Sequence, residues 1–172
     1  MKKLMQQDAS ASRTCGDNRL GHNVVREGYT MKNDMKLFFA NRSDNESFAR
    51  VVIGAFIARL DPVLSEMEDV KTAVSEAVTN AIVHGYGERE GYVELSARVE
   101  GRTAFIEVAD SGCGIEDVER ARQPFYTSKP EQERSGMGFT VMEAFMDRVE
   151  VESEAGRGTR VRMEKTFSGE PQ

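Results

Sequence analysis

Three short segments between residues 76 and 139 constrain the fold of this chain more than any other feature. Glu76-Ala-Val-Thr-Asn80 lies within a long helical pattern and places a carboxylate and a carboxamide one turn apart. Asp110-Ser-Gly-Cys-Gly114 ends a strand pattern in an acid and a glycine turn, and Gly136-Met-Gly-Phe139 opens another helix. Each segment alone is common in unrelated proteins. Their occurrence in this order predicts that a helix, a strand end and a helix start meet at one site.

Hydrophobic periodicity predicts an α+β protein. We expect strands at residues 35–41, 92–99, 103–109, 147–153 and 159–165, of which the second and third form a hairpin. We expect helices at residues 43–60, 65–85, 115–121 and 138–146, the first two opened by Ser-x-x-Glu capping boxes at Ser43 and Ser65. Residues 122–135 lack periodicity and are expected to form a mobile loop. This pattern predicts a two-layer α/β sandwich, with helices covering one face of a mixed, mostly antiparallel sheet.

Composition excludes several classes of protein. No apolar stretch approaches the roughly 20 residues of a membrane span, and polar residues follow Met1-Lys-Lys-Leu where a signal peptide would be apolar, so we expect a cytoplasmic protein without membrane contact. The net charge is −6, and residues 1–30 hold five basic and three acidic side chains, so the remainder carries −8. This acidic body argues against direct nucleic-acid binding. Two cysteines and two histidines predict neither a disulfide framework nor a His/Cys metal site.

The chain divides into three parts by sequence pattern. Residues 1–30 are rich in polar residues without apolar periodicity, and we expect a disordered leader there. Patterned sequence begins at Met31, which we expect to be the native start, the leader being translated upstream sequence or a non-native extension; a genuine flexible arm is the alternative. Residues 31–166 form the expected domain, and residues 167–172 a flexible tail.

The first segment has the side chains for metal-assisted proton transfer. The amide oxygen of Asn80 is a hard ligand suited to Mg²⁺, which takes one or two protein oxygens and completes its shell with phosphates and water. Glu76, one turn earlier, would lie near the metal and could accept a hydroxyl proton. His84, four residues after Asn80, is expected to be structural at the helix end.

The other two segments have the features of a nucleotide site. The carboxylate of Asp110 can accept a hydrogen bond from the amino group of adenine, while the glycines that follow let the chain pass close to the base. Gly136 and Gly138 lie at a helix start, where free backbone N–H groups bind phosphate. Lys129 and Arg134, in the preceding loop, could neutralise the terminal phosphate. Neither a Walker loop nor a Rossmann fingerprint is present, so the ordered set indicates an ATP site of another type.

The ordered set resembles the Bergerat-fold ATPase superfamily of gyrase, heat-shock chaperones, histidine kinases and mismatch-repair ATPases. Residues 76–80 resemble its asparagine box, residues 110–114 and 136–139 its two glycine boxes, and Gly158-Thr159 its last short motif. Over residues 31–166 the chain is more closely similar to the anti-sigma F factor family of spore-forming bacilli. The segments that carry this resemblance are Asn45-Glu-Ser-Phe-Ala-Arg50, Leu60-Asp-Pro62, Ser75-Glu-Ala-Val-Thr-Asn-Ala-Ile-Val-His-Gly-Tyr86, Ala121-Arg-Gln-Pro-Phe-Tyr-Thr-Ser-Lys-Pro130 and Glu133-Arg-Ser-Gly-Met-Gly-Phe139.

The resemblance implies an inhibitor that is also a serine protein kinase. It implies a homodimer that binds the sporulation sigma factor F and, with ATP and Mg²⁺, phosphorylates a serine of an anti-anti-sigma protein, ADP being the product. Glu76 would be the general base, Asn80 the metal ligand, and Arg50 part of the surface that binds both partners. The implied nucleotide contacts are Asn80, Asp110, Gly112, Gly114, Thr127, Lys129, Arg134, Ser135, Gly136, Met137, Gly138, Phe139 and Thr159.

Three other functions share parts of this sequence pattern. A kinase of the same family that governs a general-stress sigma factor would share the fold and the chemistry, and stays open. The ATP-binding domain of a two-component histidine kinase needs a preceding helical hairpin with a phospho-accepting histidine. Only His22 precedes the domain, in a segment without helical periodicity, so this function is rejected. A pure nucleotide-binding module is disfavoured, because holding ATP does not require a base such as Glu76 beside Asn80.

Overall fold

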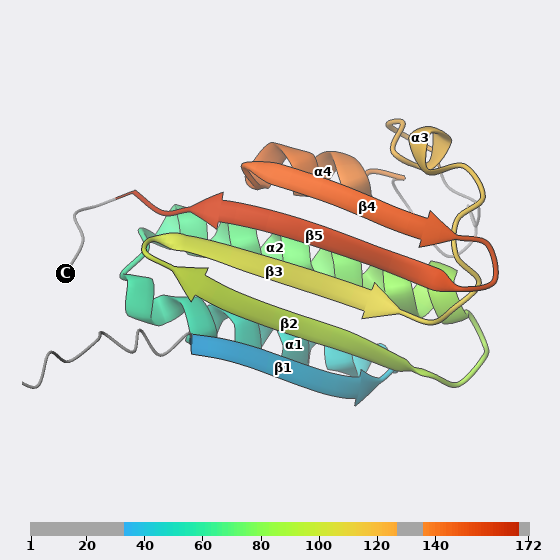
Figure 1. The fold of residues 1–172 in the computed structure, drawn as a ribbon, viewed down its shortest axis with the longest axis horizontal. Helices are drawn as coiled ribbons and strands as arrows, with labels where there is room; N and C mark the ends of the chain where they lie inside the picture. The colour runs from blue at the N-terminus through green and yellow to red at the C-terminus, as the bar shows by residue number, and fades with distance from the viewer. Residues whose placement is uncertain (1–32, 127–135, 169–172) are drawn as a thin grey trace, which may run out of the picture. The chain divides into compact units, whose positions relative to one another are not determined.

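Strands and helices follow one another largely as the hydrophobic periodicity predicts (Figure 1). The computed structural model describes residues 33–126 and 136–168, so the predicted leader lies outside the described residues. The strands are β1 (Asn33–Ala40), β2 (Tyr92–Glu100), β3 (Thr103–Asp110), β4 (Arg148–Glu154) and β5 (Gly158–Thr166). The helices are α1 (Asp44–Ile57), α2 (Leu64–Asn80), α3 (Val118–Ala121) and α4 (Gly138–Phe145), with a 3-10 turn, η1 (Ala58–Leu60), and a π-helical turn, η2 (Ala81–Tyr86).

The five strands form one sheet in the order β1-β2-β3-β5-β4. Every neighbouring pair is antiparallel, so the prediction of a mixed sheet is wrong in that detail. Two hairpins account for the pairs β2–β3 and β4–β5. Two helices, rather than one, lie between β1 and β2, so the chain reverses direction once more and returns antiparallel to β1.

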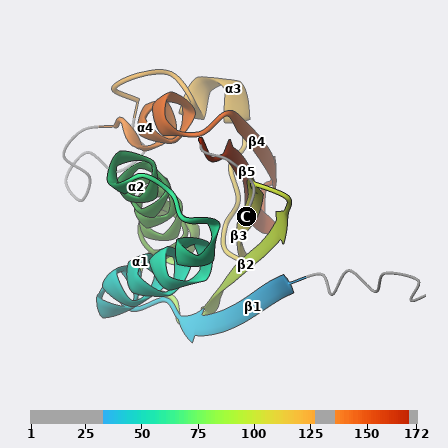
Figure 2. The ribbon, with the colours of Figure 1, turned by 90° about the vertical axis from the view of Figure 1, so that its left-hand side faces the viewer.

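Helices α1, α2 and α4 lie on one face of this sheet, as Figure 2 shows, which confirms the predicted two-layer sandwich. Alternate residues of the strands point into the layer between sheet and helices, and the apolar stripe of α2 meets them. The largest fully buried side chains are Ile53, Ile57, Leu95, Met142, Met163, Val70, Val74, Val78, Val93 and Val108. This core holds the C-terminal end of α2 against β3, where the predicted site residues lie.

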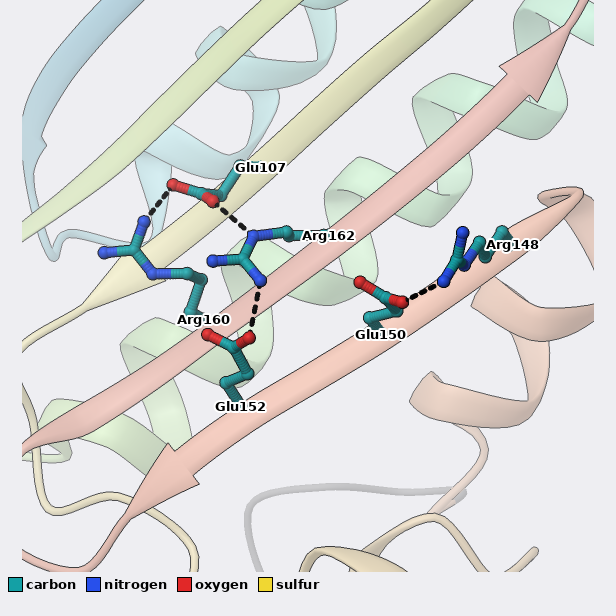
Figure 3. Close-up of polar contacts among 6 residues, drawn as sticks. All are labelled: Glu107, Arg148, Glu150, Glu152, Arg160 and Arg162. Carbon is teal, nitrogen blue, oxygen red and sulfur yellow. Dashed lines mark hydrogen bonds and ion pairs between the residues drawn. The ribbon is translucent and has the colours of Figure 1, made fainter.

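The other face of the sheet carries charged side chains in cross-strand pairs, shown in Figure 3. Glu107 of β3 accepts hydrogen bonds from Arg160 and Arg162 of β5, the latter at 2.9 Å. Arg162 also pairs with Glu152 of β4 at 2.6 Å. Because these side chains are partly or fully exposed, we read them as a solvated surface that contributes little to stability.

The capping box predicted at the start of α1 is not formed. Ser43 is the N-cap residue, but its side chain makes no capping hydrogen bond. Glu46, the predicted partner, instead accepts a hydrogen bond from the hydroxyl of Ser75 on α2. A long-range contact between two helices has therefore replaced the local one.

The second predicted capping box is displaced by two residues. Helix α2 begins at Leu64, its N-cap is Val63, and the carboxylate of Glu66 accepts the N–H of Val63 at 3.3 Å. Glu68, which the sequence assigned to the box, pairs with Arg50 of α1 at 2.8 Å instead.

The end of the sheet opposite the site holds residues that the sequence assigned to the flexible tail. Phe167 is buried, and its backbone N–H donates to the carbonyl oxygen of Arg102 at 3.0 Å. The N–H of Ser168 donates to the carboxylate of Glu66 at 2.9 Å. The packed part of the chain therefore runs at least two residues beyond the predicted boundary at 166.

Candidate functional site

A pocket of about 420 Å³ is lined by residues from the end of β3, the start of β5 and α3. These three parts of the chain lie at the same end of the sheet (Figure 1). The pocket wall contains residues of all three segments that the sequence singled out: Asn80 of α2, Asp110, Gly114, Gly136, Gly138 and Phe139. Thr159 at the start of β5 lines it as well. The structure therefore brings together residues as far apart in the sequence as Asn80 and Thr159, as the order of the motifs predicts.

The helix that carries Asn80 changes its winding at the pocket. The sequence predicts one α-helix to Gly85, but α2 ends at Asn80 and continues as the π-helical turn η2. A π-turn holds more residues per turn than an α-helix, so the spacing of side chains along the helix changes after Asn80. His84 and Gly85 of this turn both line the pocket.

Glu76 and Asn80 meet the start of α4 at Gly138. A Cβ atom at Gly138 would lie 3.2 Å from Glu76 Oε2 and from Asn80 Nδ2, and 3.3 Å from Asn80 Oδ1. Glu76 is not part of the pocket wall itself, but it lies beside the glycine that is. A residue with a side chain would crowd both groups, so glycine allows the helix start, with its free N–H groups, to lie against a carboxylate and a carboxamide.

Asp110, the last residue of β3, is held by the turn that follows it. Its Oδ1 accepts the backbone N–H of Gly112 at 2.8 Å. Burial raises the pKa of Asp110, an effect opposed in part by the hydrogen bonds from Gly112 and Thr159 and by the charge of Arg89. A Cβ atom at Gly85 would lie 2.7 Å from Oδ1, so this glycine lets the end of η2 approach the carboxylate. The result is a desolvated acceptor facing the pocket.

Steric contacts explain why the second segment has glycine at positions 112 and 114. A Cβ atom at Gly112 would overlap the carbonyl oxygen of Gly85, and one at Gly114 would overlap that of Glu154. Gly114 also has a φ of +69°, in the region that favours glycine. Between them, the N–H of Cys113 donates to the Gly85 carbonyl at 2.8 Å. The turn is therefore packed against η2 by its backbone.

Two hydroxyl groups near this turn, those of Tyr86 and Ser153, have roles that the sequence does not predict. Tyr86 is buried, and its Oη donates to the carbonyl oxygen of Tyr92 at 2.7 Å and accepts the N–H of Ser111 at 2.9 Å. Ser153 of β4 contacts Thr159 and the N–H of Ile115. Tyr86 ends one of the segments that carry the resemblance, but no local pattern in the sequence indicates its hydrogen bond to Ser111 or that of Ser153 to Ile115.

Four predicted nucleotide contacts lie outside the described residues, so their roles stay predictions: Thr127, Lys129, Arg134 and Ser135. The residues on either side are described. The N–H of Phe125 donates to the carbonyl oxygen of Gly136 at 3.0 Å, and Tyr126 and Gly136 both line the pocket.

Arg50, the predicted partner-binding residue, lies on α1 and is not part of the pocket wall. Its guanidinium pairs with Glu68 at 2.8 Å and donates to the hydroxyl of Thr72 at 3.3 Å, both on α2. Its side chain is still 32% exposed.

Asn80 offers one amide oxygen as a ligand, which suits a metal ion whose other ligands are phosphate oxygens and water. Within residues 33–126 and 136–168, no three His, Cys, Asp or Glu side chains form a group that could hold a metal ion. Mg²⁺ commonly has one or two protein oxygens as ligands and completes its coordination with phosphate oxygens and water. An amide oxygen next to a helix start that can bind phosphates fits this requirement. In the same part of the chain, no helix has the length and apolar character needed to span a membrane.

Comparisons with known proteins identify the family of this chain. The model of the histidine kinase-like ATPase domain matches residues 39–165. An anti-sigma F factor of Clostridium kluyveri is 59% identical over 136 residues, which are 79% of this chain and 96% of that protein. Those of Clostridium acetobutylicum and Geobacillus stearothermophilus are 56% and 55% identical over 80% of this chain and 96% and 94% of their own lengths. The resemblance noted from the motifs is therefore confirmed at the level of the whole domain.

Proposed function

Since the chain belongs to the anti-sigma F factor family and carries a histidine kinase-like ATPase domain, we propose that it binds and inhibits the sporulation sigma factor F and acts as a serine protein kinase. Its protein substrate is an anti-anti-sigma protein, and its phosphate donor is ATP. With a sigma factor as partner, the protein works in the cytoplasm. The observation that carries the kinase part is the close approach of Gly138 to both Glu76 and Asn80.

The pocket accommodates the nucleotide in one orientation. Asp110 and Thr159 form a base end, at which the carboxylate accepts a hydrogen bond from the adenine amino group. Glu76, Asn80 and Gly138 form a phosphate end, at which the N–H groups at the start of α4 receive the phosphates. Asn80 would hold Mg²⁺ there, and the ion would supply positive charge next to the phosphate oxygens.

Glu76 is the general base of the transfer. Its carboxylate accepts the proton of the serine hydroxyl as that oxygen bonds to the terminal phosphorus. The bond from this phosphorus to the bridging oxygen breaks, and ADP leaves with the electron pair. The position of Glu76 one helical turn from Asn80 supports this role, because it places a base next to the metal ligand.

Four residues between Tyr126 and Gly136 belong to the proposed nucleotide contacts. Lys129 and Arg134 would neutralise the terminal phosphate, and Thr127 and Ser135 would bind the nucleotide. This part of the proposal is supported by the two flanking residues, since both line the pocket.

The protein partners bind on and around α1. Arg50 lies on this helix, which also carries Phe48 and Val51, 47% and 67% exposed. Arginine and aromatic side chains are enriched among the residues that carry the binding energy of protein interfaces. Strand β1 is an edge of the described sheet and carries the exposed Phe38, which supports assembly of two copies as a homodimer.

Phosphate transfer tests the kinase part directly. The protein is incubated with ATP labelled in its terminal phosphate, Mg²⁺ and an anti-anti-sigma protein, and the label is followed onto serine. We expect serine labelling that stops when a chelator removes Mg²⁺. Binding of ATP without any transfer to the protein substrate would contradict the kinase role and leave a nucleotide-binding inhibitor.

Charge reversal tests the partner surface. Arg50→Glu is expected to weaken binding of sigma factor F at least tenfold, because it removes the interface arginine and repels the former partner Glu68, while ATP affinity stays unchanged. Arg59→Glu on η1 is the matched control. Wild-type affinity of the Arg50 variant for both protein partners would remove this assignment. The same binding assay with a general-stress sigma factor distinguishes the alternative partner.

A further inference from the structure

Ser153 makes three hydrogen bonds at the base end of the pocket. Its Oγ accepts the backbone N–H of Ile115 at 2.8 Å and donates to the carbonyl oxygen of Gly158 at 2.9 Å. It also lies 2.9 Å from Oγ1 of Thr159. The three partners come from the turn after β3 and from the start of β5, so one side chain on β4 joins the segments that surround the base.

The number of protons in this group fixes the direction of each bond. A serine hydroxyl has one proton to donate and two lone pairs to accept with. A carbonyl oxygen can only accept, so the proton of Ser153 is directed at Gly158. The bond between the two hydroxyls therefore needs Thr159 as its donor. Thr159 then has no second proton, and it presents only lone pairs to the pocket that it lines.

Asp110 presents acceptors at the same place. It is the direct partner of Thr159 in the β3–β5 ladder, and both residues line the pocket. An ionised carboxylate accepts and does not donate. Two neighbouring acceptors can form hydrogen bonds with the N–H groups of a ligand. An oxygen of a ligand at the same place would form none and would leave the acceptors unsatisfied.

We propose that Ser153 is a positioning residue that makes the pocket selective for 6-amino purine nucleotides over 6-oxo purine nucleotides. It does so without touching the base, by holding the hydroxyl of Thr159 as an acceptor. A 6-oxo purine places its exocyclic oxygen against the acceptors of Asp110 and Thr159. Without Ser153, Thr159 is free to rotate and donate to that oxygen. The inference rests on the proposed nucleotide site.

Calorimetric titration of ATP and inosine triphosphate tests this, since the two nucleotides differ only in the base, where the 6-amino group is replaced by an oxygen and N1 gains a hydrogen. In Ser153→Ala we expect the ratio of the inosine triphosphate Kd to the ATP Kd to fall roughly fivefold. Loss of the bonds to Ile115 and Gly158 weakens both nucleotides equally and leaves this ratio unchanged. An unchanged ratio with intact ATP binding overturns the role of Ser153 alone.

A second variant avoids disturbing the bonds of Ser153 to the backbone. Thr159→Val is expected to lower ATP affinity about threefold and to leave inosine triphosphate affinity within about twofold. An equal loss for both nucleotides overturns the inference. Thr166→Ala is the matched control, because Thr166 forms a hydroxyl pair of 2.9 Å with Thr103 at the other end of the same two strands. If the wild-type protein binds neither nucleotide, the inference and the proposed function both fall.

Discussion

The two ends of the pocket hold their functional groups in place by different means. At the base end, hydrogen bonds orient the polar groups: Asp110 accepts from Gly112, and Thr159 is bonded to Ser153. At the phosphate end, the absence of a side chain at Gly138 sets how closely α4 approaches Glu76 and Asn80. The base end thus fixes the orientation of its polar side chains, and the phosphate end fixes the distance between α4 and the side chains of Glu76 and Asn80. Substitutions at the first should change affinity and selectivity, and substitutions at the second should change turnover.

The largest expected effect is at the phosphate end. Glu76→Gln keeps the shape of the side chain but cannot accept the serine proton at neutral pH. We expect kcat to fall at least about 100-fold, or about 2.7 kcal/mol of barrier, with ATP affinity within about twofold of wild type. Single-turnover transfer and nucleotide titration measure the two quantities.

Glu116→Gln is the matched control for this variant, because Glu116 lines the same pocket without being among the groups that crowd Gly138. A loss of turnover below tenfold in Glu76→Gln, or an equal loss in the control, would show that Glu76 is not the base.

At the base end, Asp110→Asn should separate binding from folding. The neutral amide keeps an oxygen for the N–H of Gly112 but loses the charged acceptor for the adenine amino group. We expect ATP affinity to fall roughly 30-fold, within the range for hydrogen bonds to charged groups. Titration of wild-type and variant protein with ATP measures this, and normal affinity would remove Asp110 from the base end.

The same variant should make the unliganded protein no less stable at neutral pH. Because burial raises the pKa of Asp110 in the fold, its ionised form is disfavoured there, and the native state binds this proton more tightly than the unfolded chain does. The resulting penalty is complete above the folded pKa and disappears as the pH falls through that pKa to the unfolded value. Thermal melts between pH 4 and 8 should therefore show Asp110→Asn gaining stability relative to wild type as the pH rises.

Gly138→Ala tests whether distance matters at the phosphate end. The added Cβ would lie 3.2 Å from Glu76 Oε2, and the side chains of Glu76 and Asn80 must shift by a few tenths of an ångström. We expect kcat to fall about tenfold, because a small misplacement of a base is costly, with the fold retained. Gly54→Ala is a matched control, since its Cβ would lie equally close, 3.2 Å, to Lys71 on the α1–α2 contact. Unchanged turnover in Gly138→Ala would contradict the proposed geometry.

The sequence predicts the short motifs of the site but not the hydrogen bonds between distant segments. The spacing of Glu76 and Asn80, and the glycines at 112, 114, 136 and 138, could be identified because each motif is a short run of sequence, although the atoms that leave no room for a side chain at these glycines lie elsewhere in the chain. The hydroxyls of Tyr86 and Ser153 could not, because their partners lie on other strands and turns. The two predicted capping boxes are wrong for a related reason, because Glu46 and Glu68 interact with residues of a neighbouring helix. Local spacing thus predicted where the groups would meet, but tertiary contacts decided which atoms orient them.

The smallest expected effect comes from Tyr86, whose hydroxyl supports the base end from behind. Tyr86→Phe keeps the buried ring but removes the bonds to Ser111 and Tyr92, and we expect a cost of about 1 kcal/mol in unfolding free energy and about threefold in ATP affinity. Tyr92→Phe, with an exposed ring, is the control. If the variant loses stability while its ATP affinity stays at the wild-type value, the orientation of Asp110 does not depend on Tyr86, and the hydrogen bonds that matter at the base end reduce to those of Gly112 and Ser153.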